Sequence, residues 1–176
     1  MITIVLFFSY TFALSPRPSQ GFEDTARLLQ DPARAKDRIL ICSDSNSEGG
    51  FIVAVAMNDR RPQHIVLRTT KFLSENTWSE KTYHPRISTP QAVKEFLDEY
   101  QVDSIVIDQS LTLWEQDRQL LLAAIGLDPN WKILTDGITP GTYRHITVYR
   151  RQQDPNKKPG ILRVPLSKTL QRDLTL

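Results

Sequence analysis

Short apolar runs alternate with amphipathic segments along most of the chain. Runs rich in Ile, Val and Leu predict buried strands, whereas apolar residues spaced three or four positions apart predict helices. The predicted strands are residues 39–42, 64–68, 104–108, 131–136 and 142–150. The predicted helices are residues 22–29, 47–58, 90–100 and 120–127.

Alternation of strands and helices is typical of an α/β fold with right-handed crossovers. We therefore predict a three-layer, Rossmann-like domain with a small, mostly parallel sheet. Residues 142–150 alternate in polarity and predict an antiparallel edge strand. Residues 160–166 predict a further edge strand, since Pro165 has no N–H to donate within a central strand. Residues 71–87 have no clear period and predict a long excursion.

The chain of 176 residues suits one domain with a real core. We predict an apolar anchor (residues 1–14), a linker (15–21), the α/β domain (22–150) and a C-terminal extension (151–176). The net charge of +2 is small and the basic residues are scattered, so nothing indicates nucleic-acid binding.

The N-terminal residues 1–14 carry no charge. As a helix they would span about 21 Å, short of the ~30 Å hydrocarbon core of a bilayer. Three interpretations remain open: the outer half of a membrane helix whose beginning is missing, a signal-peptide core without a basic region, or a buried strand. The first two place the rest of the chain outside the cytoplasm, attached to or exported across a membrane.

Three predicted strands end in aspartate, at Asp44, Asp108 and Asp136. In a parallel sheet the carboxyl ends of the strands share one edge, where ligands bind. Such a rim suits sugar hydroxyls or, through oxygen ligands, a divalent ion. The alternative is that each aspartate only caps the following helix or turn.

The loop after the first strand is rich in Ser and Asp. Ser45 and Glu48 have the spacing of a capping box, and they would also join the aspartate rim. Arg68 follows the second strand and reaches the same rim, either as an anion clamp or as an ion-pair partner. The loop matches neither G-x-G-x-x-G nor a Lys-bearing P-loop, and its carboxylates would repel phosphate. The candidate ligand-binding residues are Asp44, Ser45, Glu48, Arg68, Asp108 and Asp136.

No complete catalytic motif is present. The sequence has no G-x-S-x-G elbow and no H-E-x-x-H, and its three histidines lack metal-ligand spacing. The single cysteine, Cys42, lies inside an apolar strand and reads as a buried small residue. We therefore predict no catalytic residue, no metal ligand and no cofactor.

Two strings carry a resemblance: "RILICSDSNSEGGFIVAVAMNDRRPQHIVLRTTKFLSENTW" and "STPQAVKEFLDEYQVDSIVID". Together with the preceding apolar segment, they resemble the soluble C-terminal region of bacterial multi-pass glycosyltransferases of the dolichyl-phosphate-mannose mannosyltransferase-like (GT-C) kind. The similarity spans residues 21–150 and rests on short strings rather than on a diagnostic motif.

The resemblance implies a membrane parent that transfers sugar from a lipid-linked donor. Its catalytic acid is expected in an early loop between membrane helices, which this chain lacks. The chain would then be a non-catalytic extracytoplasmic domain, with residues 1–14 in the membrane and the domain packed against a multi-pass segment. The alternatives are a free-standing, exported or anchored module that binds a sugar or a divalent ion, and an enzyme acting alone.

Overall fold

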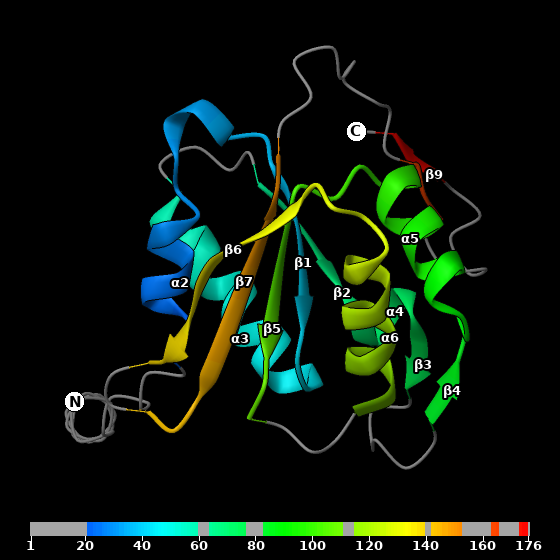
Figure 1. The fold of residues 1–176 in the computed structure, drawn as a ribbon. Coiled ribbons are helices and arrows are strands. Elements are labelled where there is room, and N and C mark those ends of the chain that lie inside the picture. The colour runs from blue at the N-terminus through cyan, green and yellow to red at the C-terminus, as the bar shows by residue number, and fades with distance from the viewer. Residues whose placement is uncertain are drawn as a thin grey trace, which may run out of the picture.

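The computed structural model describes residues 21–59, 64–76, 83–110, 115–139, 142–152, 163–165 and 173–175. The predicted α/β architecture is confirmed: a five-stranded, mostly parallel sheet lies between two layers of helices (Figure 1). The apolar residues 1–14 lie outside the described residues, so the three interpretations of that segment stay predictions. Within the described residues, no helix is long and apolar enough to span a bilayer.

The sheet has the order β2-β1-β5-β7-β6. Strands β1 and β2 pair in parallel, as do β1 and β5, while β7 runs antiparallel to both of its neighbours. The edge strand β6 therefore runs in the same direction as β5. The strands are β1 (Arg38–Cys42), β2 (Ile65–Arg68), β5 (Ser104–Asp108), β6 (Trp131–Ile138) and β7 (His145–Arg151).

Strand β1 is apolar on both faces because helices cover both faces of the sheet. Ile39 and Ile41 pack toward α2 (Glu23–Leu28) and α3 (Ser45–Asn58). Leu40 and Cys42 point the other way, into the core formed with α5 (Pro90–Glu99) and α6 (Glu115–Gly126). Alternate side chains of the short run Ile-Leu-Ile-Cys thus pack into two separate hydrophobic cores, one on each face of the sheet.

The predicted helix start at Thr89 is confirmed. The Thr89 hydroxyl accepts a hydrogen bond from the Ala92 amide at 3.2 Å, and Pro90 occupies the first helical position. Val93, Phe96 and Leu97 form the buried face of α5, as the spacing predicts. Helix α6 begins at Glu115, earlier than the predicted residue 120.

Two strand assignments need correction. Residues 145–151 form the predicted antiparallel strand, but it lies between β5 and β6 rather than at the edge. Strand β6 forms the edge of the sheet, because β7 pairs with β5 on one side and with β6 on the other. Residues 163–165 form β8 (Arg163–Pro165), which pairs with β9 (Asp173–Thr175) in a separate two-stranded sheet.

The excursion at residues 71–87 contains regular structure. Helix α4 (Thr69–Phe72) leads into the antiparallel pair β3 (Ser74–Asn76) and β4 (Tyr83–Pro85). A short 3-10 helix, η1 (Pro32–Arg34), joins α2 to β1.

Candidate functional site

The order of the strands places a topological switch point between β1 and β5. After β1 the chain passes through α3, on one face, to β2; after β5 it enters α6, on the opposite face. Ligands of open α/β sheets bind outside the carboxyl ends of two strands that diverge in this way. Ser43 and Asp44 follow β1, and Asp108 ends β5, so these residues flank the switch point.

Asp44 is the N-cap of α3. Its carboxylate accepts hydrogen bonds from the amides of Asn46 and Ser47, both at 2.9 Å, and from the Ser47 hydroxyl at 2.5 Å. Ser45 is the first residue of the helix, so the predicted Ser45–Glu48 capping box is wrong. Asp44 is as good an N-cap residue as serine, and its carboxylate accepts from two amides of the first turn, so the helix starts one residue earlier than the capping box requires.

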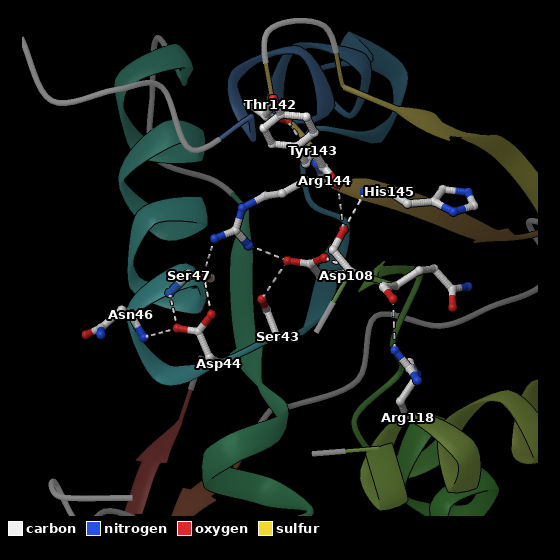
Figure 2. A network of polar contacts seen from close by, with 12 residues as sticks. Ser43, Asp44, Asn46, Ser47, Asp108, Arg118, Thr142, Tyr143, Arg144 and His145 are labelled. Atoms are coloured by element: carbon white, nitrogen blue, oxygen red, sulfur yellow. Dashed lines mark hydrogen bonds and ion pairs between the residues drawn. The ribbon is translucent and has the colours of Figure 1, made fainter. Parts of the chain in front are cut away.

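Asp108 lies at the centre of a polar network, and its side chain is fully buried (Figure 2). Its Oδ2 accepts a hydrogen bond from the Ser43 hydroxyl at 3.1 Å and forms an ion pair with Arg144. Its Oδ1 accepts from the Ser110 amide at 3.0 Å. A buried carboxylate needs a charged partner and hydrogen bonds of this kind, so the network satisfies Asp108 within the fold.

Arg144 connects four elements. It directly precedes β7, forms an ion pair with Asp108 on β5, and donates to the Ser47 hydroxyl on α3 at 2.8 Å. Its guanidinium also lies 5.2 Å from the ring centroid of Phe22, the N-cap residue of α2. Figure 2 shows this side chain reaching from the β7 end of the network toward both Ser47 and Asp108.

A second network surrounds Glu48, which is completely buried. Arg68 donates from Nε to Glu48 Oε2 at 2.9 Å, and the Thr69 hydroxyl donates to Oε1 at 2.8 Å. The Thr70 hydroxyl and amide also donate to this carboxylate. Arg68 donates further to the Ser45 carbonyl at 2.9 Å. The predicted ion-pair role of Arg68 is therefore the one observed, and Glu48 fastens α3 to the end of β2.

Burial raises the pKa of the Glu48 carboxyl above its ordinary value of 4.5, against the hydrogen bonds from Thr70, Arg68 and Thr69 that lower it. A raised native pKa means that the folded state holds the proton to higher pH than the unfolded state does. Stability contributed by this group is therefore complete below 4.5 and is lost as pH rises through the native pKa.

This direction predicts how Glu48→Gln behaves. The wild type should lose free energy of unfolding relative to Glu48→Gln as the pH rises from 4.5 through the raised native pKa of Glu48. Urea denaturation of both proteins across that range measures the difference. A difference that is constant with pH, or that changes in the opposite direction, would show that the native pKa of Glu48 is not raised.

Asp136 lies apart from the other predicted site residues. It is exposed on the edge strand β6, with the whole of β7 between it and β5. Its Oδ1 accepts from the Thr147 hydroxyl at 2.7 Å and lies 2.7 Å from His145 Nε2, and these two contacts lower the pKa of the Asp136 carboxyl. The three strand-end aspartates therefore do not converge. Among the described residues, no three His, Cys, Asp or Glu side chains come together as a metal site.

Three charged residues at this edge were not predicted as site residues from the sequence: Arg144, Asp117 and Arg118. Arg144 falls inside the predicted strand of residues 142–150, and nothing in the sequence marked it as a partner of Asp108. Asp117 is completely buried in the first turn of α6, and Arg118 beside it donates to the Gln109 carbonyl at 3.0 Å. The spacing of apolar and polar residues around positions 117 and 118 does not predict that Asp117 is buried or that Arg118 contacts the loop after β5.

Cys42 is buried, as predicted, and burial raises the pKa of its thiol to about 12. The reactive thiolate is therefore scarce at neutral pH. We predict that a thiol-specific reagent such as DTNB modifies Cys42 only after the protein is denatured. Modification of the native protein at the rate of a free small thiol would contradict this burial.

Two of the three described histidines pair with carboxylates. His64 Nδ1 lies 2.8 Å from Asp59 Oδ1, at the opposite edge of the sheet, and His145 Nε2 lies 2.7 Å from Asp136 Oδ1. The third, His84, is exposed on β4, outside the five-stranded sheet. The Ser43 hydroxyl, at the switch point, donates to Asp108 rather than to a histidine. The contacts of this network join the ends of β1 and β5 to α3 and to the start of β7, and Ser43 has no histidine beside it among them.

Comparison with known proteins adds little to this geometry. No family model matches the chain, and no curated protein matches it. A solved structure of a protein in the NADB-Rossmann superfamily from Streptococcus agalactiae is similar over 82% of this chain and 73% of that one, with 12% sequence identity and a TM-score of 0.32. That score carries no argument about function. The α/β assignment rests on the order and direction of the strands themselves.

Proposed function

We propose that residues 22–150 form a non-catalytic, extracytoplasmic domain of a membrane glycosyltransferase that uses a lipid-linked sugar donor. Two features support the proposal. The sequence of residues 21–150 resembles the soluble region of such enzymes, and an uncharged segment of fourteen residues precedes it. The domain would stabilise the membrane part or help to position its acceptor, while catalysis stays with the membrane part.

The observation that carries the non-catalytic role is how the carboxylates at the ligand-binding edge are used. Asp44 caps α3, Asp108 is paired with Arg144, and Glu48 is paired with Arg68. A general acid or base must reach the substrate with a proton-transfer atom exposed to it. Asp108 and Glu48 instead have fully buried side chains directed at partners within the fold.

The proposal predicts a sharp contrast in activity. The purified chain, incubated with a polyprenyl-phosphate-linked sugar and an acceptor, should neither transfer nor hydrolyse the sugar. Membranes that contain the chain in its native setting should transfer it, and deleting the codons for residues 22–150 should lower that transfer. Turnover by the purified chain would contradict the non-catalytic role, and unchanged transfer by the deletion membranes would contradict the accessory role.

The switch point favours one second candidate, a free-standing, exported or anchored module that binds a sugar. Ser43, Asp44 and Arg144 offer hydroxyl, carboxylate and guanidinium groups at the place where open α/β sheets bind ligands. Asp44→Ser is the discriminating variant, since serine keeps a good N-cap and removes the carboxylate. If the chain is such a module, calorimetric titration with monosaccharides should give saturable binding that falls in Asp44→Ser. Equal heats for both proteins would exclude Asp44 from any sugar site.

A further inference from the structure

We infer that the carboxyl edge of the sheet, which holds the Asp108–Arg144 pair, faces the lipid surface, with the turn between β6 and β7 at the level of the headgroups. This inference rests on the membrane attachment of residues 1–14 in the proposed function. It goes further by assigning which side of the domain meets the bilayer.

The chain enters the fold at Gly21, beside Thr139 and Thr142. Gly21 is buried and has a φ of +80°, a conformation that favours glycine. A methyl group added to it would lie 3.0 Å from Thr142 Oγ1 and 3.2 Å from Thr139 Cγ2. The backbone of Gly21 therefore packs directly on Thr139 and Thr142, the residues that follow β6 and precede β7.

The turn between β6 and β7 lies at the carboxyl edge of the sheet. Strand β6 runs in the direction of β5 and ends at Ile138, while β7 starts at His145 opposite it. Arg144, the residue before β7, reaches Asp108 at the end of β5. Figure 1 shows the ends of β1, β5 and β6 and the start of β7 together along its lower edge, and Figure 2 shows Thr142 and Tyr143 beside the network.

The tether, residues 15–20, is short. Six residues, 15–20, separate the apolar segment from Gly21. Fully extended, they reach at most about 21 Å, at ~3.5 Å per residue. A compact domain of this size is wider than that, with a radius of gyration of about 14 Å. The edge at which the tether enters therefore stays within about 21 Å of the end of the apolar segment, and the tether is too short for the opposite edge of the sheet to face the membrane.

The surface of the turn has the chemistry of a membrane interface. The Tyr143 side chain is fully exposed, and Ile138 is 70% exposed. Ile138 and the half-exposed Leu28 also line a cavity of about 290 Å³ between α2 and the β6–β7 hairpin. Tyrosine is enriched where membranes meet water, because its ring is apolar and its hydroxyl is polar. Ile138 and Tyr143 are the sequence neighbours of Thr139 and Thr142, which pack on Gly21 at the end of the tether.

This orientation would open the switch point between β1 and β5 toward the membrane. The headgroup of a lipid-linked sugar would approach the β1–β5 edge directly from the membrane, without passing around the domain. The opposite edge, with Asn130 directly before β6, would point away from the lipid. The eight residues of β6 separate the two levels by about 26 Å, at ~3.3 Å per residue.

Depth-dependent quenching tests this orientation. Full-length Tyr143→Cys and Asn130→Cys variants are labelled with a fluorophore, with Cys42 protected by its burial, and are reconstituted into vesicles of phosphatidylethanolamine and phosphatidylglycerol. A fraction of the lipids carries a nitroxide on the headgroup. We expect several-fold stronger quenching of the label at position 143 than of the label at position 130.

Equal quenching at the two positions, or stronger quenching at position 130, would overturn the inference. So would a chain that does not sediment with the vesicles. Failure of the orientation is distinct from failure of the proposed function, because the latter is measured by sugar transfer in native membranes with and without residues 22–150.

Discussion

Arg144→Ala is expected to lower the free energy of unfolding by about 3–5 kcal/mol, because it leaves the buried carboxylate of Asp108 without its cation. The Asp108 side chain is fully buried, so solvent cannot replace the lost partner. The substitution also removes the hydrogen bond to Ser47 and the contact with the Phe22 ring. Urea denaturation followed by circular dichroism measures the loss.

Two further variants control this prediction. Arg27→Ala breaks an ion pair with Asp24 in which both side chains are about two-thirds exposed, and it should change stability by less than about 1 kcal/mol. Arg144→Lys keeps the charge but loses the planar fork that serves Asp108 and Ser47 together, so its stability should lie between wild type and Arg144→Ala. Arg144→Ala no more destabilised than Arg27→Ala would refute the view that the pair holds the edge together.

Glu48→Ala is expected to cost about 3 kcal/mol or more, for a related reason. The hydroxyls of Thr69 and Thr70 would lose their acceptor inside the protein, and Arg68 would lose its carboxylate partner. Each unsatisfied buried group costs about 1–3 kcal/mol, and Arg68 recovers part of its loss because it is partly exposed.

Glu95→Ala is the matched control for Glu48→Ala. Glu95 is an exposed glutamate within α5, and its replacement should change stability by less than about 0.5 kcal/mol. Equal thermal midpoints for Glu48→Ala and Glu95→Ala would mean that the Glu48 network does not stabilise the fold. It would also reopen a ligand-binding role for Glu48.

The fold was predictable because its signals are local. The β1 run Ile-Leu-Ile-Cys is apolar at every position, which indicates a strand covered on both faces, and Thr89-Pro90 marks a helix start one turn before its apolar stripe. The predicted edge position of residues 142–150 was wrong. The alternation of polar and apolar residues in a strand indicates which side chains face the core, but it does not indicate which strands lie beside it. Only the pairing of β7 with both β5 and β6 places it inside the sheet.

The site was predictable only in part. Asp44, Ser45, Glu48, Arg68 and Asp108 do gather at one edge, since each ends a parallel strand or follows one. Asp136 does not join them, because β7 is inserted between β5 and β6. Arg144 was missed for the same reason: its contact with Asp108 depends on a pairing between segments more than thirty residues apart.

The networks also change how the candidate residues are interpreted. Asp44 caps a helix, and Glu48 and Asp108 have arginine partners, so their main contribution is to hold α3, β2, β5 and β7 together. This use of the carboxylates supports the proposed non-catalytic role. The proposed ligand and membrane contacts depend instead on the switch point itself, on Tyr143 and Ile138, and on the place where Gly21 enters the fold.

The most direct test of the account is to recover the chain from its native membranes in mild detergent and identify, by mass spectrometry, what is joined to it or bound to it. The account predicts a multi-pass membrane glycosyltransferase segment, either continuous with residues 22–150 or in a stable complex with them. Recovery of the chain alone, with no multi-pass segment joined or bound, would contradict the accessory role and favour a free-standing binding module.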